Sequence, residues 1–318
     1  MKKRLSFLLA ILLLCMPLTA MAGGDVYEDS LAETFTYEDT VLPYRLLLPD
    51  DYNEKESYPL ILFLHGAGER GTDNETQMKN VFQKISNKNR GAILVAPQCD
   101  PENQWVDTPW AEGPYSTDEV PESNELQAVM ALIENIQENY SVDKTRIYAT
   151  GLSMGAFGVW DLMIRHNDVF AAGVACCGGG DPSKGELLKD TPMFVFHGSA
   201  DPTVPVEGSR DTVNAIVEAG GEVVFYKEYP NYPHGIWDIA FEEVGLFDEL
   251  MQYRLSDRYD IEVDEVNETE IEGDTTGNTT EETTDSTLFY LYIGVGVVVV
   301  FIVIVIVVVM LKKKKNVK

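Results

Sequence analysis

The chain has 318 residues, of which 45% are hydrophobic and 24% charged, and its formal net charge is −28. This excess of acidic residues repels nucleic acids and anionic lipid head groups, so the acidic part of the chain is not expected to bind either. Residues 25–255 are enough for a single domain with its own hydrophobic core.

The N-terminus has the pattern of a secretory signal peptide. Three basic residues precede an apolar run at residues 5–18, and the small residues of Ala20-Met21-Ala22 form a cleavage site. Residues 1–22 are therefore predicted to be a signal peptide that directs export. The alternative is an uncleaved N-terminal anchor, which would leave the domain on the same side of the membrane.

The next segment alternates between apolar runs and stretches of helical spacing. Strands are predicted at residues 41–48, 60–64, 92–96, 146–150, 171–175, 193–196 and 222–229. Helices are predicted at residues 125–140, 154–166, 206–219 and 237–253. This order predicts an α/β domain over residues 25–255, with a mostly parallel central sheet and helices on both faces.

The C-terminal part has a different composition. Residues 256–287 are acidic and rich in threonine, which predicts a disordered stalk. Residues 288–311 carry no charge and are long enough for one transmembrane helix. The lysines of the tail, residues 312–318, are expected to stay in the cytoplasm. The predicted product is a single-pass cell-membrane protein with its α/β domain outside the cell and its C-terminus in the cytoplasm.

A serine motif, Gly151-Leu152-Ser153-Met154-Gly155, stands between a predicted strand and a predicted helix. Glycines at these two positions permit a sharp turn that lifts the serine hydroxyl above the end of a sheet. The helix that follows favours negative charge at its N-terminus. Ser153 is therefore predicted to be a nucleophile, whereas the alternative is an ordinary turn serine.

A serine nucleophile needs a base, and the base needs a group that orients it. His234 follows the last predicted strand, and Asp201 follows the strand before it. The order Ser153, Asp201, His234 is the one found in hydrolases of this architecture. The other three histidines are assigned to loops, a helix end or the surface.

A loop of small residues, His65-Gly66-Ala67-Gly68, follows the strand at residues 60–64. Small residues allow backbone N–H groups to approach a substrate oxygen closely. The N–H groups of Ala67 and Met154 are therefore predicted to form an oxyanion hole.

These motifs make the sequence resemble secreted carboxylesterases of the α/β-hydrolase superfamily, near its dienelactone-hydrolase, feruloyl-esterase and prolyl-oligopeptidase-like branches. The resemblance covers about residues 35–253 and implies an α/β-hydrolase fold and a Ser-Asp-His triad. It is carried by Leu64-His65-Gly66-Ala67-Gly68-Glu69-Arg70-Gly71, Ala96-Pro97-Gln98-Cys99, Gly151-Leu152-Ser153-Met154-Gly155 with Trp160-Asp161, Cys177-Gly178-Gly179-Gly180-Asp181, Phe196-His197-Gly198 with Asp201-Pro202, and His234 with Trp237.

The expected activity is hydrolysis of small-molecule or polymer-linked esters outside the cell, such as acyl groups on polysaccharides, without a metal or organic cofactor. Peptide hydrolysis is the first alternative, and a non-catalytic surface binding protein is the second. Trp105, Trp110 and Trp237 are candidate substrate contacts, or they simply pack the loops that carry them. The sequence leaves the oligomeric state open.

The predicted mature chain contains three cysteines, Cys99, Cys176 and Cys177. Cys99 could pair with either of the other two if both strand ends meet near the site. Buried free thiols are the equally weighted alternative.

Overall fold

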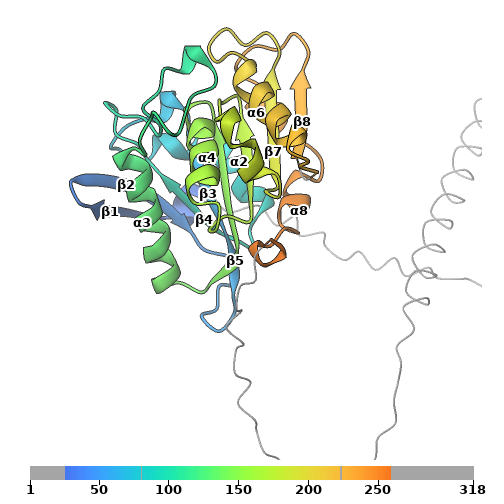
Figure 1. Cartoon of the computed structure of the whole chain (residues 1–318). Coiled ribbons are helices and arrows are strands. Elements are labelled where there is room, and N and C mark those ends of the chain that lie inside the picture. Colours follow the sequence, from blue (N-terminus) through green and yellow to red (C-terminus); the bar gives the residue numbers. More distant parts are fainter. Residues whose placement is uncertain (1–25, 80, 223, 259–318) are drawn as a thin grey trace, which may run out of the picture. The chain divides into compact units, whose positions relative to one another are not determined.

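The computed structural model describes residues 26–79, 81–222 and 224–258 (Figure 1). The chain divides into two units, Met1–Glu262 and Val263–Lys318, and all described residues belong to the first. The predicted signal peptide, the transmembrane helix at 288–311, the tail at 312–318 and most of the stalk lie outside the described residues.

One eight-stranded sheet forms the centre of the domain, in the order β1-β2-β4-β3-β5-β6-β7-β8. Within β4-β3-β5-β6-β7-β8 each strand runs parallel to the next, whereas β1 pairs antiparallel with β2 and β2 antiparallel with β4. The prediction of a mostly parallel central sheet is therefore confirmed. The strands are β1 (Leu31–Tyr37), β2 (Thr40–Leu47), β3 (Tyr58–Leu64), β4 (Ile93–Pro97), β5 (Val142–Leu152), β6 (Ala172–Cys176), β7 (Met193–Gly198) and β8 (Val224–Tyr229).

Helices cover both faces of this sheet (Figure 1). Leu60, Leu62 and Leu64 of β3 belong to one core cluster, which also holds apolar residues of α3, α4 and α6. Ile61 and Phe63 belong to a second cluster, with residues of α2 and α8. Successive side chains of β3 point to opposite faces of the sheet, and each face has its own hydrophobic core. Every position of β3 from Leu60 to Leu64 is therefore apolar, which explains the continuous apolar run in the sequence. The helices are α1 (Val26–Asp29), α2 (Val81–Lys88), α3 (Asn124–Asn139), α4 (Met154–Arg165), α5 (Gly185–Leu188), α6 (Glu207–Glu218), α7 (Trp237–Ala240) and α8 (Leu246–Leu250).

The last predicted helix, at residues 237–253, is wrong as a single element. The structure has two short helices there, α7 and α8, separated by a turn that contains Gly245. Gly245 has a φ of +81°, a left-handed conformation that interrupts a right-handed helix. The apolar spacing continues across the break because both helices pack on the same face of the sheet.

The three described cysteines are free, and all are buried. Cys99 belongs to one core cluster, whereas Cys176 and Cys177 belong to the other. The structure therefore agrees with the alternative of buried free thiols, and it contains no disulfide between Cys99 and Cys176 or Cys177.

The domain continues slightly beyond the predicted start of the stalk. A short 3₁₀ helix, Leu255–Asp257, ends at Arg258, whose guanidinium donates hydrogen bonds to Thr191 Oγ1 and to the Phe170 carbonyl, both at 2.6 Å. Within the described part of the chain, no helix has the length and apolar character needed to cross a membrane.

Candidate active site

The turn between β5 and α4 holds Ser153 in an unusual backbone conformation, with φ +52° and ψ −121°. A Cβ on Gly151 would lie 2.5 Å from the Gly155 carbonyl oxygen. A Cβ on Gly155 would lie 2.0 Å from the carbonyl oxygen of Leu64 in β3. Both glycines are therefore required for α4 to start this close to the sheet, and the strained turn presents Ser153 at the carboxyl end of β5.

Three side chains from different strand ends form a continuous hydrogen-bonded chain. Ser153 Oγ lies 2.8 Å from His234 Nε2, and His234 Nδ1 lies 2.6 Å from Asp201 Oδ2. Asp201 follows β7, and His234 follows β8, so the carboxyl ends of three parallel strands bring the groups together. The structure thus places Ser153 and Asp201 on opposite ring nitrogens of His234.

The second carboxylate oxygen of Asp201 is held by backbone. It accepts hydrogen bonds from the N–H groups of Thr203 at 2.8 Å and Val204 at 3.0 Å. Burial raises the pKa of the Asp201 carboxyl, but hydrogen bonds from His197, His234 and these N–H groups hold it well below its usual range. Asp201 is therefore a fixed negative charge beside the imidazole.

His234 responds to this charge. Burial lowers the pKa of His234, but the hydrogen bond to the Asp201 carboxylate outweighs burial and raises this pKa to about 9. In the neutral imidazole, which forms as the pH rises through this pKa, the same carboxylate fixes the proton on Nδ1 and leaves Nε2 facing Ser153 as the acceptor. This arrangement suits a general base.

The loop after β3 approaches the serine. A Cβ on Gly66 would lie 3.5 Å from the Cβ of Ser153 and 2.8 Å from Leu152 Cδ1, so this position accepts only glycine without a shift. Ala67 and Met154 are the first residues of their helices, whose leading N–H groups have no acceptor within the helix. Two N–H groups are thus available beside Ser153, where the sequence predicts an oxyanion hole.

A second serine–histidine pair lies deeper in the domain. His197 Nδ1 is 2.8 Å from Ser209 Oγ, and His197 Nε2 is 3.2 Å from Asp201 Oδ2. His197 and Ser209 are both fully buried, and Ser209 Oγ also donates to the Gly178 carbonyl. His197 helps to hold the Asp201 carboxylate in place, and the buried His197–Ser209 pair is not accessible to substrate.

The predicted aromatic contacts fall into two groups. Trp105 is fully buried and donates its indole N–H to the His65 carbonyl, so it packs the core and does not face a substrate. Trp110 and Trp237 are partly exposed. Trp237 meets the His234 ring edge-to-face at 5.3 Å, and Trp110 lies 5.9 Å from the guanidinium of Arg70. Trp105 is thus a wrong assignment caused by an aromatic-rich loop whose first tryptophan points inward.

One cluster could in principle offer metal ligands. Ligand atoms of Cys177, Asp201 and His234 lie within 4.8 Å of one another. Both carboxylate oxygens of Asp201 already accept hydrogen bonds, from backbone and from two histidines. The cluster fits a network of hydrogen-bonded protein groups better than a metal site, and the absence of a cofactor stays a prediction.

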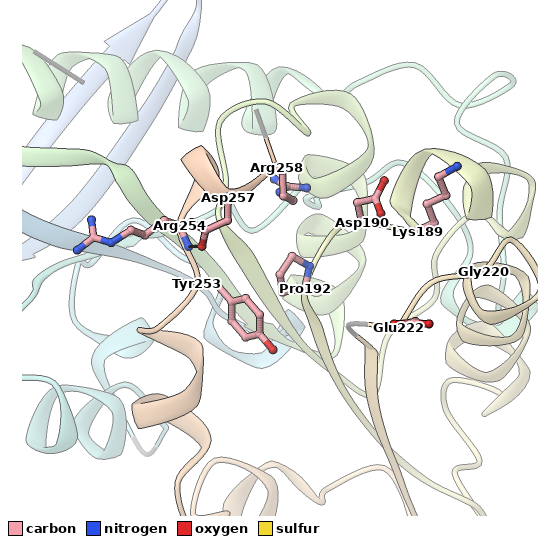
Figure 2. Close-up of a pocket in the computed structure, with 9 residues that line it drawn as sticks. All are labelled: Lys189, Asp190, Pro192, Gly220, Glu222, Tyr253, Arg254, Asp257 and Arg258. Atoms are coloured by element: carbon pink, nitrogen blue, oxygen red, sulfur yellow. Dashed lines mark hydrogen bonds between the residues drawn. The ribbon is translucent and has the colours of Figure 1, made fainter. Parts of the chain in front are cut away.

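A cavity of about 500 Å³ lies at the other end of the sheet (Figure 2). Pro192 directly precedes β7 and Glu222 shortly precedes β8, so this cavity opens at the amino ends of the strands. It is therefore separate from the Ser153 edge. Its lining residues are Lys189, Asp190, Pro192, Gly220, Glu222, Tyr253, Arg254, Asp257 and Arg258.

Comparison with known proteins identifies the family. Residues 39–245 match the family model described as "Putative esterase". The chain is 27% identical over 191 residues to "Probable feruloyl esterase C" of Aspergillus terreus, covering 56% of this chain and 62% of the relative. It is 24% identical to the bifunctional acetylxylan esterase/xylanase XynS20E of Neocallimastix patriciarum, covering 45% of this chain and 19% of that protein.

A solved structure supports the same assignment. The crystal structure of a thermostable esterase has a TM-score of 0.64 and 37% sequence identity, covering 72% of this chain and 64% of that chain. The chain thus spans less than two thirds of the length of these relatives. Since the family match covers well over half of the sequence, the chain belongs to this esterase family of the α/β-hydrolase superfamily.

Proposed function

We propose that the chain is a serine carboxylesterase that removes acyl groups from polysaccharides or other extracellular polymers. The observation that carries the proposal is the hydrogen-bonded chain from Ser153 through His234 to Asp201, at the carboxyl edge of the sheet and beside the Gly66 loop. Esterase-family membership supports the reaction class.

In the proposed acylation step, His234 Nε2 takes the Ser153 proton as Oγ attacks the ester carbonyl. The N–H groups of Ala67 and Met154 stabilise the oxyanion, each contributing roughly 2.7–4 kcal/mol to the transition state. Asp201 stabilises the imidazolium that forms and keeps its own negative charge. His234 then protonates the leaving alkoxide, which departs as the alcohol.

Deacylation repeats the same steps with water as nucleophile. His234 removes a proton from water, the hydroxide attacks the acyl-serine, and the returned proton restores Ser153. In both steps protons move only among Ser153, His234 and the reactants. The proposed cycle therefore requires no metal or organic cofactor.

The proposed substrate class rests on the relatives and on the expected location. Two relatives are named as feruloyl and acetylxylan esterases. Trp110 and Trp237, both partly exposed, provide aromatic faces for a sugar ring or an aromatic acyl group. Export and a C-terminal membrane anchor, proposed from the sequence, would present the domain to polymers outside the cell. Peptide hydrolysis is the alternative activity.

A substrate panel tests the proposal. Purified protein should hydrolyse a chromogenic short-chain ester and release acetate or ferulate from acylated sugars, and it should leave peptide anilides intact. Turnover of peptide anilides with no turnover of esters would support the peptidase alternative. No turnover of either class would favour a non-catalytic surface binding protein.

The pH dependence of kcat/KM reports the state of His234. Protonated His234 cannot accept the Ser153 proton, so kcat/KM should rise with pH. Because the His234 pKa is raised to about 9, the midpoint should lie clearly above the ordinary value of about 6.5. Initial rates measured between pH 5 and pH 10, corrected for spontaneous hydrolysis, provide the check. A plateau already complete below pH 6.5 would contradict the expected charge interaction.

A further inference from the structure

Cys177 lies behind the His234 loop, and the proposed reaction does not use it. It directly follows β6, and its side chain is fully buried. Its thiol donates a hydrogen bond to the carbonyl oxygen of His234 at 3.2 Å, and its own N–H donates to the Phe196 carbonyl at 2.8 Å. The sulfur also lies within 4.8 Å of ligand atoms of Asp201 and His234.

The backbone of Cys177 adopts a conformation that favours glycine. Its φ is +56°, in the left-handed region where a side chain with a Cβ is disfavoured. Glycines occupy the next three positions, Gly178, Gly179 and Gly180. A cysteine is therefore held here at a conformational cost, and such outliers cluster at functional sites.

The His234 loop has a largely exposed surface. Tyr232, Pro233 and Gly235 are exposed, so little apolar burial fixes the segment that carries the base. Backbone bonds hold two of its carbonyls: the N–H of Ala200 reaches Tyr232 at 3.0 Å, and the N–H of Ile236 reaches His234 at 2.9 Å. The Cys177 thiol adds a buried side-chain donor to the second of these carbonyls.

We infer that Cys177 is a positioning residue for the His234 base. The thiol fixes the His234 carbonyl from inside the domain, so the imidazole stays aligned with Ser153 Oγ. Fixing the base raises kcat, because proton transfer needs the 2.8 Å contact at each of two steps, whereas ground-state substrate binding does not depend on it. This inference rests on the proposed esterase function.

Three variants test the inference. Cys177→Gly removes the thiol but suits φ +56°, so the protein should still fold, as judged by cooperative thermal unfolding. Its kcat should fall roughly 3- to 10-fold, the effect of one modest hydrogen bond, with KM within about twofold of wild type. Cys177→Ala should lower kcat similarly. Cys177→Ser keeps a donor for the same carbonyl and should restore kcat to within about twofold of wild type.

Cys99→Ala is the matched control. Cys99 is also a free, fully buried cysteine, but its side chain belongs to the core cluster on the other face of the sheet. This variant should have a lower Tm and an unchanged kcat. If the role of Cys177 were purely structural, the Cys177 variants would likewise have a lower Tm and an unchanged kcat.

The outcomes separate the two proposals. An inactive wild-type protein would overturn the esterase function. An active wild type together with Cys177→Gly at full kcat would overturn the positioning role alone. So would a Cys177→Ser variant that loses as much kcat as Cys177→Ala while remaining folded.

Discussion

Hydrolysis of a chromogenic short-chain ester by the Ser153→Ala variant is expected to be ~10⁴- to 10⁶-fold slower than by the wild type. Alanine removes the only atom of this side chain that can attack a carbonyl, and it leaves His234 without a proton to take. The variant should still bind substrate, because the Gly66 loop and the aromatic side chains are unchanged. Steady-state rates with the wild type and the variant at equal concentration provide the measurement.

Ser209 supplies a matched control. It also contacts a histidine ring nitrogen at 2.8 Å, but it is fully buried. A fluorophosphonate probe should label the wild type and Ser209→Ala on the peptide that contains Ser153, and it should leave Ser153→Ala unlabelled. Near-wild-type hydrolysis by Ser153→Ala, or labelling of another serine in the wild type, would remove Ser153 as the nucleophile.

Asp201→Asn should lower kcat by about 10⁴-fold while the fold is preserved. The Oδ1 position of Asp201 accepts two backbone N–H groups, so an asparagine would place its oxygen there and turn its NH₂ toward His234. His234 Nδ1 would then have to accept a hydrogen bond, and its proton would move to Nε2. In that tautomer Nε2 faces Ser153 as a donor and cannot take the serine proton. Single-turnover acylation rates measure the loss directly.

Asp181→Asn is the corresponding control. Asp181 is also a buried carboxylate, and it accepts hydrogen bonds from the backbone and hydroxyl groups of Thr117 and Ser183. Weakening these bonds should cost roughly 1–3 kcal/mol of stability, with kcat within a few-fold of wild type. If Asp181→Asn and Asp201→Asn lowered kcat equally, a specific orienting role for Asp201 would be untenable.

The sequence predicted those strands well whose apolar pattern follows directly from burial in the sheet. β3, β4, β6 and β7 are fully buried runs bounded by turn residues, so their order along the chain and the loops after them could be predicted. The sequence indicated Ser153, Asp201 and His234 from their hydrolase order, and the structure brings them together because the carboxyl ends of parallel strands share one edge. The glycines of the serine motif predicted a sharp turn at Ser153, and in the structure a Cβ on Gly151 or Gly155 would lie 2.5 or 2.0 Å from a carbonyl oxygen.

Elements that depend on tertiary contacts were missed. β1 is mostly exposed and is held by its pairing with β2, so its side chains give little periodic signal. The short α2 has only a few buried apolar positions, and its two turns are below the length that a pattern can identify. The burial of Trp105 could not be predicted, because the carbonyl that accepts its indole N–H belongs to His65, 40 residues away in the sequence. The sequence marked Cys177 only as part of a motif of the resemblance and as a possible partner of Cys99, since its contact with His234 exists only in the fold.

The place of Arg258 in the domain has a practical consequence. Arg258 is bonded to Phe170 and Thr191, which shortly precede β6 and β7, whereas Ser153 lies beyond the carboxyl end of β5. A support or fusion partner joined directly after Arg258 would therefore meet the domain at the opposite end of the sheet from Ser153. Immobilised in this orientation, the domain would turn its Ser153 edge outward, so the proposed activity could be tested on ester groups of an insoluble surface that cannot diffuse to the protein.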